Sequence, residues 1–313
     1  IKLKRAKLLD VNFSGVKFNS DLNYVDFRGS DLSNVDLTEH DLKNTVLSNT
    51  NMKGANLTGA ILSYEDIGRY NFLDNSDVRF TNFKNANLIG IDFTKIKNKS
   101  LAGVDLSYAS LSHADLTDVD MSKSILFHSN FWNADLSDQD FTVITNQITG
   151  SMFIDANLSN SNFEGVKLSP VEYFTYTFKN KADQINLETQ DLVRNLIDPI
   201  AHTQIFLLSE EVRGNDLVLS YVYFNNFKNA NLENTNFKNT ELLYANFGLA
   251  DFTNADLSGA DLRNTYFGNA DFTGANLSGA NLEGAVLDNA ILTNANLSDA
   301  NLNCVGHEIC TVN

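Results

Sequence analysis

Residues 250–262, which read ADFTNADLSGADL, determine the fold. In this stretch a large apolar residue recurs at every fifth position, and an alanine lies two positions before each one. The same step of five runs through residues 217–302, and from Ala230 onward the small position holds only Ala or Thr. The other three positions of each five are mostly polar. The repeating unit is therefore Ala-(Asp/Asn)-(Leu/Phe)-x-x.

A period of five residues matches neither the 3.6-residue period of a helix nor the two-residue period of a strand. The backbone must therefore turn a corner once in each repeat. If four repeats close one square coil, residues twenty apart stack, and Phe227, Phe247 and Phe267 form one interior column. Coils stacked at the inter-strand spacing of about 4.8 Å build a solenoid whose core is continuous.

The segments ADLSGADLRN, ADFTGANLSGANLEGA and ANLSDANL resemble the tandem motif of the pentapeptide-repeat protein family. The resemblance implies an all-β fold, a right-handed quadrilateral β-helix. It brings no catalytic residue with it. It also implies an alternative function, because a subset of the family resembles duplex DNA in its acidity and protects bacterial type II topoisomerases.

The same step of five covers most of the chain, with changes of phase. It predicts an N-terminal β-helix over residues 1–178, a C-terminal β-helix over residues 215–303, and a tail or cap over residues 304–313. The repeat is interrupted at residues 63–77, 94–100 and 142–147. We expect each interruption to be a loop or bulge at a corner that leaves the core intact.

A longer interruption, residues 179–214, lacks the repeat altogether. The segments INLETQDLVRNLIDP and IAHTQIFLLSEEV place apolar residues at helical intervals, with Asn186 as a candidate cap and Pro199 as a stop. The sequence therefore predicts a short α-helical insertion of two helices.

Candidate interaction residues are those that break the polar pattern of the outer surface. Apolar residues at outward positions follow the insertion, and we expect the inserted helices to cover them, a binding site being the alternative. A basic loop and the single tryptophan complete the set. The candidates are Tyr221, Tyr223, Phe224, Leu243, Tyr244, Lys95, Lys97, Lys99 and Trp132.

The composition excludes several classes of partner. The formal net charge is −16 among 313 residues, which argues against direct binding of nucleic acid or of an anionic membrane. No apolar run of about 18 residues is present, so no membrane span is expected. The sequence starts at Ile1 rather than Met, which suggests that a preceding segment is missing.

The sequence contains no motif that carries chemistry. It has no phosphate loop, no His-Glu-x-x-His helix and no nucleophile elbow, and the five histidines are scattered. We therefore expect no enzyme, no cofactor and no metal. Cys304 and Cys310 are expected to be free in a terminal cap, with a disulfide, or a metal site that includes His307, as the alternatives.

The sequence thus favours a non-enzymatic scaffold that binds another protein of unknown identity. The alternative is a DNA-mimicking rod that binds DNA gyrase or topoisomerase IV in bacteria. Against it, Asp26, Asp31, Asp36 and Asp41 fall on successive sides of one coil, which predicts that the charge is spread around the rod. A further alternative is a secreted bacterial effector, or the repeat domain of a larger one. A cytoplasmic location is expected, secretion being the alternative, and the sequence also allows a homodimer.

Overall fold

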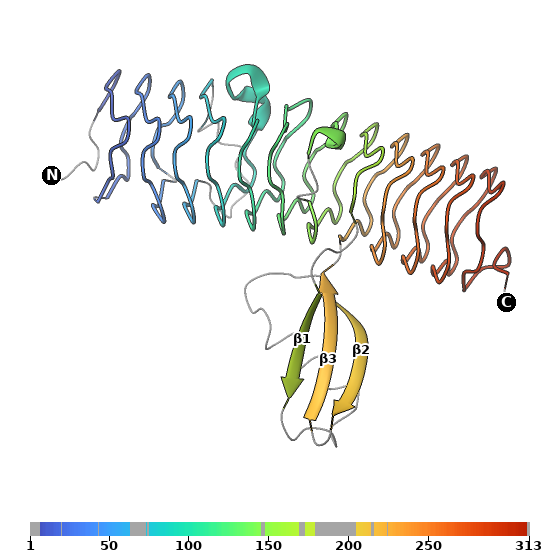
Figure 1. Ribbon diagram of the computed structural model, residues 1–313. Coiled ribbons are helices and arrows are strands. Elements are labelled where there is room, and N and C mark those ends of the chain that lie inside the picture. Colours follow the sequence, from blue (N-terminus) through green and yellow to red (C-terminus); the bar gives the residue numbers. More distant parts are fainter. Residues whose placement is uncertain are drawn as a thin grey trace.

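The structure is a computed structural model that describes residues 7–19, 21–42, 44–62, 73, 75–144, 148–168 and 225–311. It also describes the backbone of residues 173–178, 205–213 and 216–223. The described coils form an elongated rod with the two chain ends at opposite ends (Figure 1).

The rod is a four-sided β-helix in which each coil takes twenty residues. In the C-terminal half, parallel bridges join Asn226 to Asn246, Asn231 to Asp251, Asn236 to Asp256 and Glu241 to Asp261. We call the four sides a, b, c and d in this order, and name each corner by the two sides that it joins. The β-helix and its four sides are as the repeat predicts. The right-handed sense stays a prediction of the resemblance.

The core consists of columns of identical or similar side chains. The ring centroids of Phe227 and Phe247 lie 4.6 Å apart and those of Phe247 and Phe267 lie 5.5 Å apart, in both cases stacked. A second column stacks Phe252 on Phe272 at 4.7 Å. All five rings are fully buried or nearly so. The predicted interior column is therefore confirmed.

Each repeat encodes its own corner. In the repeat at Asp251, the carboxylate Oδ1 accepts a hydrogen bond from the Thr253 backbone N–H at 2.9 Å. Asn254 then takes a left-handed conformation with a φ of 57°, and the Ala255 N–H donates to the Phe252 carbonyl at 2.9 Å. Asn, Asp and Gly tolerate this conformation best. The polar residues of the motif therefore form the turns, while the apolar residue fills the core.

The small position accepts Thr or Ser because the hydroxyl finds a carbonyl in the neighbouring coil. Thr235 Oγ1 donates to the Leu158 carbonyl at 2.9 Å, and Thr240 Oγ1 donates to the Phe163 carbonyl at 2.8 Å. Both threonines are fully buried. A buried hydroxyl that is hydrogen-bonded carries little penalty, so the alternation of Ala and Thr in the motif has a structural cause.

The three shorter interruptions lie at three different corners. The first one lengthens the coil between Asn51 and Asp77 at corner ab. The second one, at corner bc, holds two 3-10 helices, η1 (Phe93–Lys95) and η2 (Lys97–Lys99). The third one, at corner cd, holds η3 (Phe141–Val143). The bridges resume beyond each of them, so the core continues past all three. Residues 63–72, 74 and 145–147 lie outside the described residues, and a loop or bulge there stays a prediction.

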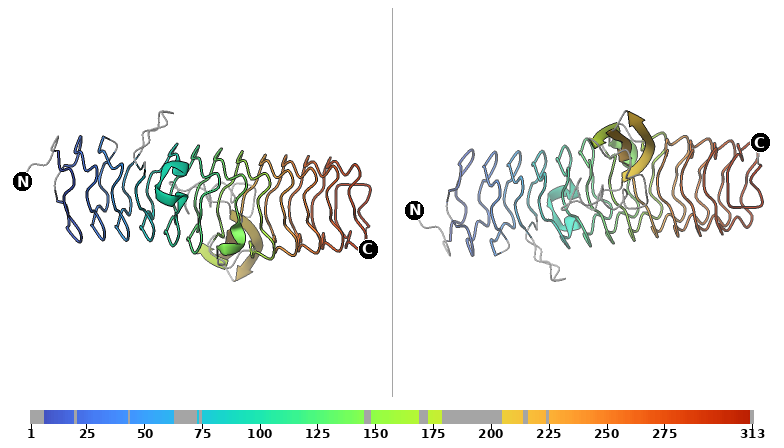
Figure 2. Two further views of the ribbon diagram at one scale, coloured as in Figure 1. Left: turned by 90° about the horizontal axis from the view of Figure 1, so that it is seen from above. Right: turned by 90° about the horizontal axis from the view of Figure 1, so that it is seen from below.

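The long insertion leaves and re-enters the rod at corner da. Met152 bridges to Asn226 across it, and the ring of Phe153 stacks on that of Phe227 at 4.9 Å, so the coils continue as if the insertion were absent. The described part is a three-stranded antiparallel sheet with β1 (Tyr173–Phe178), β2 (Ile205–Arg213) and β3 (Asp216–Tyr223). It projects away from the rod (Figures 1 and 2).

The prediction of an α-helical insertion is wrong for residues 205–213, which form β2. The apolar spacing of IAHTQIFLLSEEV fits a helix locally, but pairing with β3 decides the conformation. The coils also end at Leu168, not at residue 178, and resume at residue 225. Leu217 and Val222 keep the step of five but lie in β3. The other predicted helix, with Asn186 and Pro199, lies outside the described residues.

The C-terminal cap contains a disulfide between Cys304 and Cys310, whose Cα atoms are 5.0 Å apart. The expectation of free cysteines is therefore wrong. Cys304 is buried, and Ile309 and Cys310 pack against the end of the core. The tail thus folds back over the last coil. Within the described part of the chain, no helix has the length and apolar character needed to cross a membrane.

Candidate protein-binding surfaces

At some corners of the rod, the residue type differs from the types that the left-handed backbone conformation favours. Almost every corner places one residue at a positive φ, and most of these residues are Asn, Asp or Gly. A large side chain there costs about 1–2 kcal/mol per residue. Backbone strain of this kind points to a functional role when the residue is exposed. The residues at these positions with an aromatic, imidazole or branched apolar side chain are Tyr24, Phe80, Tyr108, His113, His128, Tyr244 and Leu249.

Two of these residues stack at corner da, in a group that we call the aromatic corner: Tyr108, Phe127 and His128. The rings of Tyr108 and His128 lie 5.1 Å apart and nearly parallel, and Phe127 meets His128 edge-on at 4.1 Å. Lys84 Nζ lies 5.7 Å from the Tyr108 ring centroid, within cation–π range. Tyr108 is 43% exposed.

The next coil leaves room for the aromatic corner. Gly150 has a φ of 73°, and a Cβ on it would lie 2.5 Å from the imidazole of His128. The left-handed backbone accepts Asn or Asp at other corners, but a side chain on residue 150 would displace the ring of His128. The insertion leaves the rod at the same corner, so the aromatic corner lies near the base of the projecting sheet.

Trp132 forms a second exposed group, at corner ab. Its indole Nε1 donates to Asp155 Oδ2 at 2.7 Å, and Asn229 Nδ2 donates to Asp155 Oδ1 at 2.8 Å. The ring of His113 meets the indole edge-on at 4.9 Å. Trp132 is 45% exposed although it is held on both sides. It is thus an ordered aromatic surface, as expected of a candidate interaction residue.

Carboxylates gather on sides b and c in the middle of the rod. Two successive coils each place one aspartate on side b, one at corner bc and one on side c. We call this set the acidic face: Asp115, Asp118, Asp120, Asp135, Asp138 and Asp140. The following coil has asparagines at the same three positions, so the acidic face has a sharp end. Corner bc lies diagonally opposite corner da, so the acidic face and the aromatic corner point in opposite directions.

Asp120 is the member of the acidic face whose carboxyl has a lowered pKa. Partial burial of Asp120 acts to raise the pKa of its carboxyl, but hydrogen bonds from the Ser122 N–H and the Ser100 hydroxyl outweigh it and lower the pKa. Asp118 is largely exposed, and its side chain meets Lys99 Nζ at 3.2 Å. The predicted basic loop with Lys95, Lys97 and Lys99 therefore borders the acidic face.

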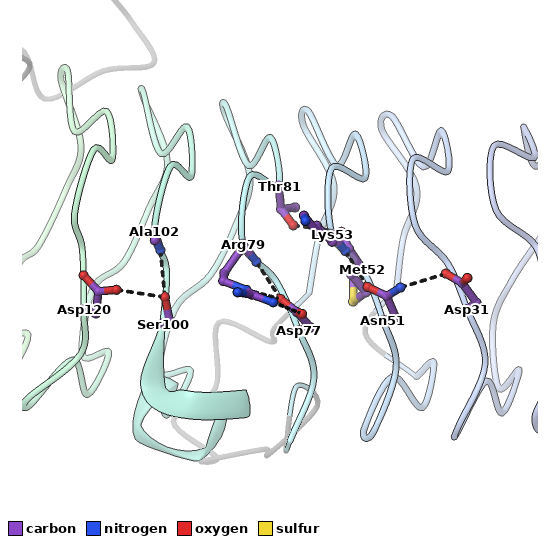
Figure 3. A network of polar contacts seen from close by, with 10 residues as sticks. All are labelled: Asp31, Asn51, Met52, Lys53, Asp77, Arg79, Thr81, Ser100, Ala102 and Asp120. Carbon is purple, nitrogen blue, oxygen red and sulfur yellow. Dashed lines mark hydrogen bonds and ion pairs between the residues drawn. The ribbon is translucent and has the colours of Figure 1, made fainter.

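Other carboxylates are neutralised by their own neighbours. On side c, Asp77 forms an ion pair with Arg79 at 2.6 Å, while Asp31 accepts from the Asn51 amide at 3.1 Å (Figure 3). The hydrogen bond from the Arg79 guanidinium lowers the pKa of Asp77 despite partial burial. This arrangement repeats at Asp26 with Arg28 and at Asp261 with Arg263. The net charge is therefore unevenly distributed.

The predicted apolar patch after the insertion stays a prediction, but two of its five residues lie in a strand and not in a coil. Tyr221 and Tyr223 belong to β3, which projects from the rod, and Phe224 lies outside the described residues. Leu243 and Tyr244 are half-buried at corner da of a coil. The five residues were predicted to share one surface because the step of five was extended back to Leu217, and that extension is wrong.

Two surfaces were missed from the sequence. The aromatic corner was detectable as large residues at the corner positions where the motif demands Asn, Asp or Gly. The acidic face was detectable by comparing residues twenty apart. No group of His, Cys, Asp or Glu among the described residues is arranged to hold a metal ion.

The comparisons with known proteins agree with this repeat. The family model described as "Pentapeptide repeats" matches in eight copies, within residues 1–38, 26–63, 95–122, 230–269 and 265–303. These segments together span more than half of the sequence. The chain belongs to the pentapeptide-repeat family. Among curated proteins, none is significantly similar to it.

Several solved structures of pentapeptide-repeat proteins are similar. HetL, involved in heterocyst differentiation regulation in Nostoc sp. strain PCC 7120, is 20% identical, with 98% of this chain and 91% of HetL covered and a TM-score of 0.29. Rfr23 from Cyanothece 51142 is 33% identical over 26% of this chain and 58% of its own, with a TM-score of 0.26. Full-length QnrB1, a plasmid-mediated fluoroquinolone resistance protein, is 14% identical. The match covers 94% of this chain and 92% of QnrB1, with a TM-score of 0.16.

Proposed function

We propose that this pentapeptide-repeat protein is a non-enzymatic scaffold that binds another protein through the corners of its rod. The observation that carries the proposal is the aromatic corner. Tyr108 and His128 occupy left-handed positions where asparagine would be more stable, and Tyr108 still exposes much of its ring. Large aromatic side chains that are ordered and exposed are typical anchors of protein interfaces.

The test replaces these residues with the one that the repeat prefers. The double variant Tyr108→Asn and His128→Asn should be at least as stable as the native protein, because asparagine suits the left-handed corner. It should bind its partner at least tenfold more weakly, measured by quantitative pull-down from the source cell and then with the purified partner. Leu249→Asn removes another exposed, strained side chain, at corner ab, and should bind normally because the proposed site is the aromatic corner. Unchanged binding by the double variant would refute the proposal.

A second candidate function is a DNA mimic that binds DNA gyrase or topoisomerase IV, and the acidic face favours it. Six carboxylates in two coils about 4.8 Å apart, less the charge of Lys99 that pairs with Asp118, leave about one charge per 1.9 Å along the rod. Duplex DNA carries about one charge per 1.7 Å. The objection from the sequence, that charge is spread around the rod, does not apply to these two coils.

Binding to purified gyrase at several salt concentrations tests this candidate. Replacing the exposed residues Asp118, Asp120, Asp138 and Asp140 with Asn should reduce the affinity and flatten its dependence on salt. The matched control replaces Asp251, Asp256 and Asp271 with Asn. These residues lie on the same two sides, b and c, of later coils. Native protein that fails to bind gyrase at low salt would eliminate the candidate.

The disulfide is relevant to the cellular compartment in which the protein is found. Disulfides persist in oxidising compartments, so the Cys304–Cys310 pair supports secretion over the cytoplasmic location that the sequence led us to expect. We therefore propose an oxidising location, which is also compatible with a secreted effector. Alkylation of the protein in lysed source cells, with and without prior reduction, distinguishes the two locations.

A further inference from the structure

The projecting sheet has two edges of different character. Its strand order is β1-β3-β2, so β3 lies between the other two (Figure 1). Among the described residues, β1 and β2 each pair with β3 alone. The outer edge of each strand presents a row of backbone donors and acceptors, and only another strand matches such a row along its length.

The β2 edge carries features that discourage pairing. Its register with β3 shifts between Leu207 and Ser209, so the strand has a bulge or irregularity there. It also contains Glu210, Glu211 and Arg213. Bulges and charged residues are the devices with which proteins protect an exposed edge against further strands.

The β1 edge carries none of these features. Its sequence, YFTYTF, has no charged residue, no proline and no glycine. It consists of aromatic residues and threonine, which favour strands. Its register with β3 is unbroken from Tyr173 opposite Val222 to Phe178 opposite Leu217. An edge of this composition is a template for another strand.

We propose that β1 pairs antiparallel with β1 of a second copy of this chain, forming a homodimer with a continuous six-stranded sheet. Antiparallel pairing of a strand with its own copy is symmetric about a two-fold axis, so one edge suffices for a closed dimer. The order becomes β2-β3-β1-β1-β3-β2. Both unprotected edges are then buried, and the only edges left are the two that are already protected.

The distribution of charge permits this association. A chain with a net charge of −16 repels its own copy unless the acidic parts stay apart. The sheet leaves the rod at corner da, diagonally opposite the acidic face. Near that corner the rod presents Tyr108, His128, Leu243 and Tyr244, and two of the nearby carboxylates, Glu241 and Asp261, are paired with Lys167 and Arg263. A second copy therefore fits the β1 edge better than a partner that must be recruited by charge. The proposal does not depend on the scaffold function.

The test is the mass of the protein in solution, by size-exclusion chromatography with light scattering. The native protein should show twice the chain mass of 34.7 kDa. The double variant Thr175→Lys and Thr177→Lys, which places charges on the β1 edge, should show the mass of one chain. The matched control Ser209→Lys and Glu211→Lys, on the β2 edge, should stay dimeric. Circular dichroism and thermal unfolding verify that the coils remain folded in both variants.

Hydrogen exchange provides a readout that does not depend on a variant. Amides of residues 173–178 should exchange more slowly as the protein concentration rises, whereas amides of residues 205–213 should not respond. A native protein that is monomeric at its highest soluble concentration overturns the proposal. So does a β1 variant that remains dimeric, because the interface would then lie elsewhere.

Discussion

Truncating Phe247 to alanine tests the assignment of the core. Phe247 is fully buried between Phe227 and Phe267 in the stacked column. It also meets Phe252 at 5.1 Å and Phe237 at 6.1 Å. Its ring therefore contacts four others in three successive coils.

The magnitude follows from these contacts. Replacing a buried phenylalanine with alanine costs about 3–5 kcal/mol, the upper end applying where the site cannot collapse. The coils are fixed by backbone hydrogen bonds on both sides of residue 247, such as Phe247 N–H to the Tyr266 carbonyl at 2.8 Å, so the cavity should stay open. We therefore expect a loss near 4 kcal/mol in the free energy of unfolding, roughly the middle to upper part of that range.

Urea denaturation followed by circular dichroism measures the loss, with Asp251→Asn as the control. Asp251 is exposed, and its Oδ1 only accepts from the Thr253 N–H, which an asparagine oxygen also does. The control should change the free energy of unfolding by less than about 0.5 kcal/mol. Because solenoids depend on contacts between neighbouring repeats, hydrogen exchange in the Phe247→Ala variant should accelerate most in the adjacent coils. Equal losses for the two variants would refute the assignment of inward and outward positions.

Three further predictions concern the corners, an ion pair and the cap. Gly150→Ala should lower the melting temperature more than Gly165→Ala, because both have a positive φ but only the first Cβ meets a histidine ring in the preceding coil. Hydrogen bonds from Lys17 and then Thr38 lower the pKa of Asp36 from 3.8 to about 2. The folded-state pKa of Asp36 is lowered, so the stabilisation from its ionised carboxylate is present above pH 3.8 and is lost as the pH falls through about 2. Lys17→Met should weaken this dependence of the free energy of unfolding on pH, measured by acid denaturation. Cys304→Ser should cost about 2 kcal/mol in the free energy of unfolding, measured against the oxidised protein.

The coils were predictable because each repeat carries its own instructions. Asp251 makes the hydrogen bond of its corner, Asn254 takes the left-handed conformation, and Phe252 fills the interior, all within four residues. Residues twenty apart then stack without further information. This is why the column of Phe227 and Phe247 could be predicted from spacing alone.

The projecting sheet was not predictable, because its strands pair with distant segments of the chain and not within one repeat. β1 pairs with β3 between residues that are 39 to 49 positions apart, and no local motif encodes such a pairing. The apolar spacing within β2 fits a helix equally well when its partner is unknown. Leu217 and Val222 continue the step of five, and Ser220 is of a type that the small position also holds in described coils, as at Ser151 and Ser161. The step of five therefore does not by itself mark a coil.

The candidate surfaces were partly predictable. Trp132 and the basic loop at residues 94–100 were found because they depart from the motif, and both are exposed. Asp26, Asp31, Asp36 and Asp41 do lie on four successive sides of one coil, as predicted, but later coils were not compared with one another. The stacking direction joins residues of different coils, so Asp115 and Asp135 become neighbours that no comparison within one coil reveals.

The four interruptions occupy the four corners of the rod, one at each, and this limits how a partner can bind. A globular partner that rests on one side contacts at most the two corners that flank it. The acidic face and the basic loop share corner bc, whereas the aromatic corner and the projecting sheet share corner da. Because these two corners are diagonal, one partner cannot cover both. The two proposed binding surfaces are therefore separable. The proposed dimerisation through β1 leaves both acidic faces open, so gyrase binding and self-association should vary independently in the variants described above.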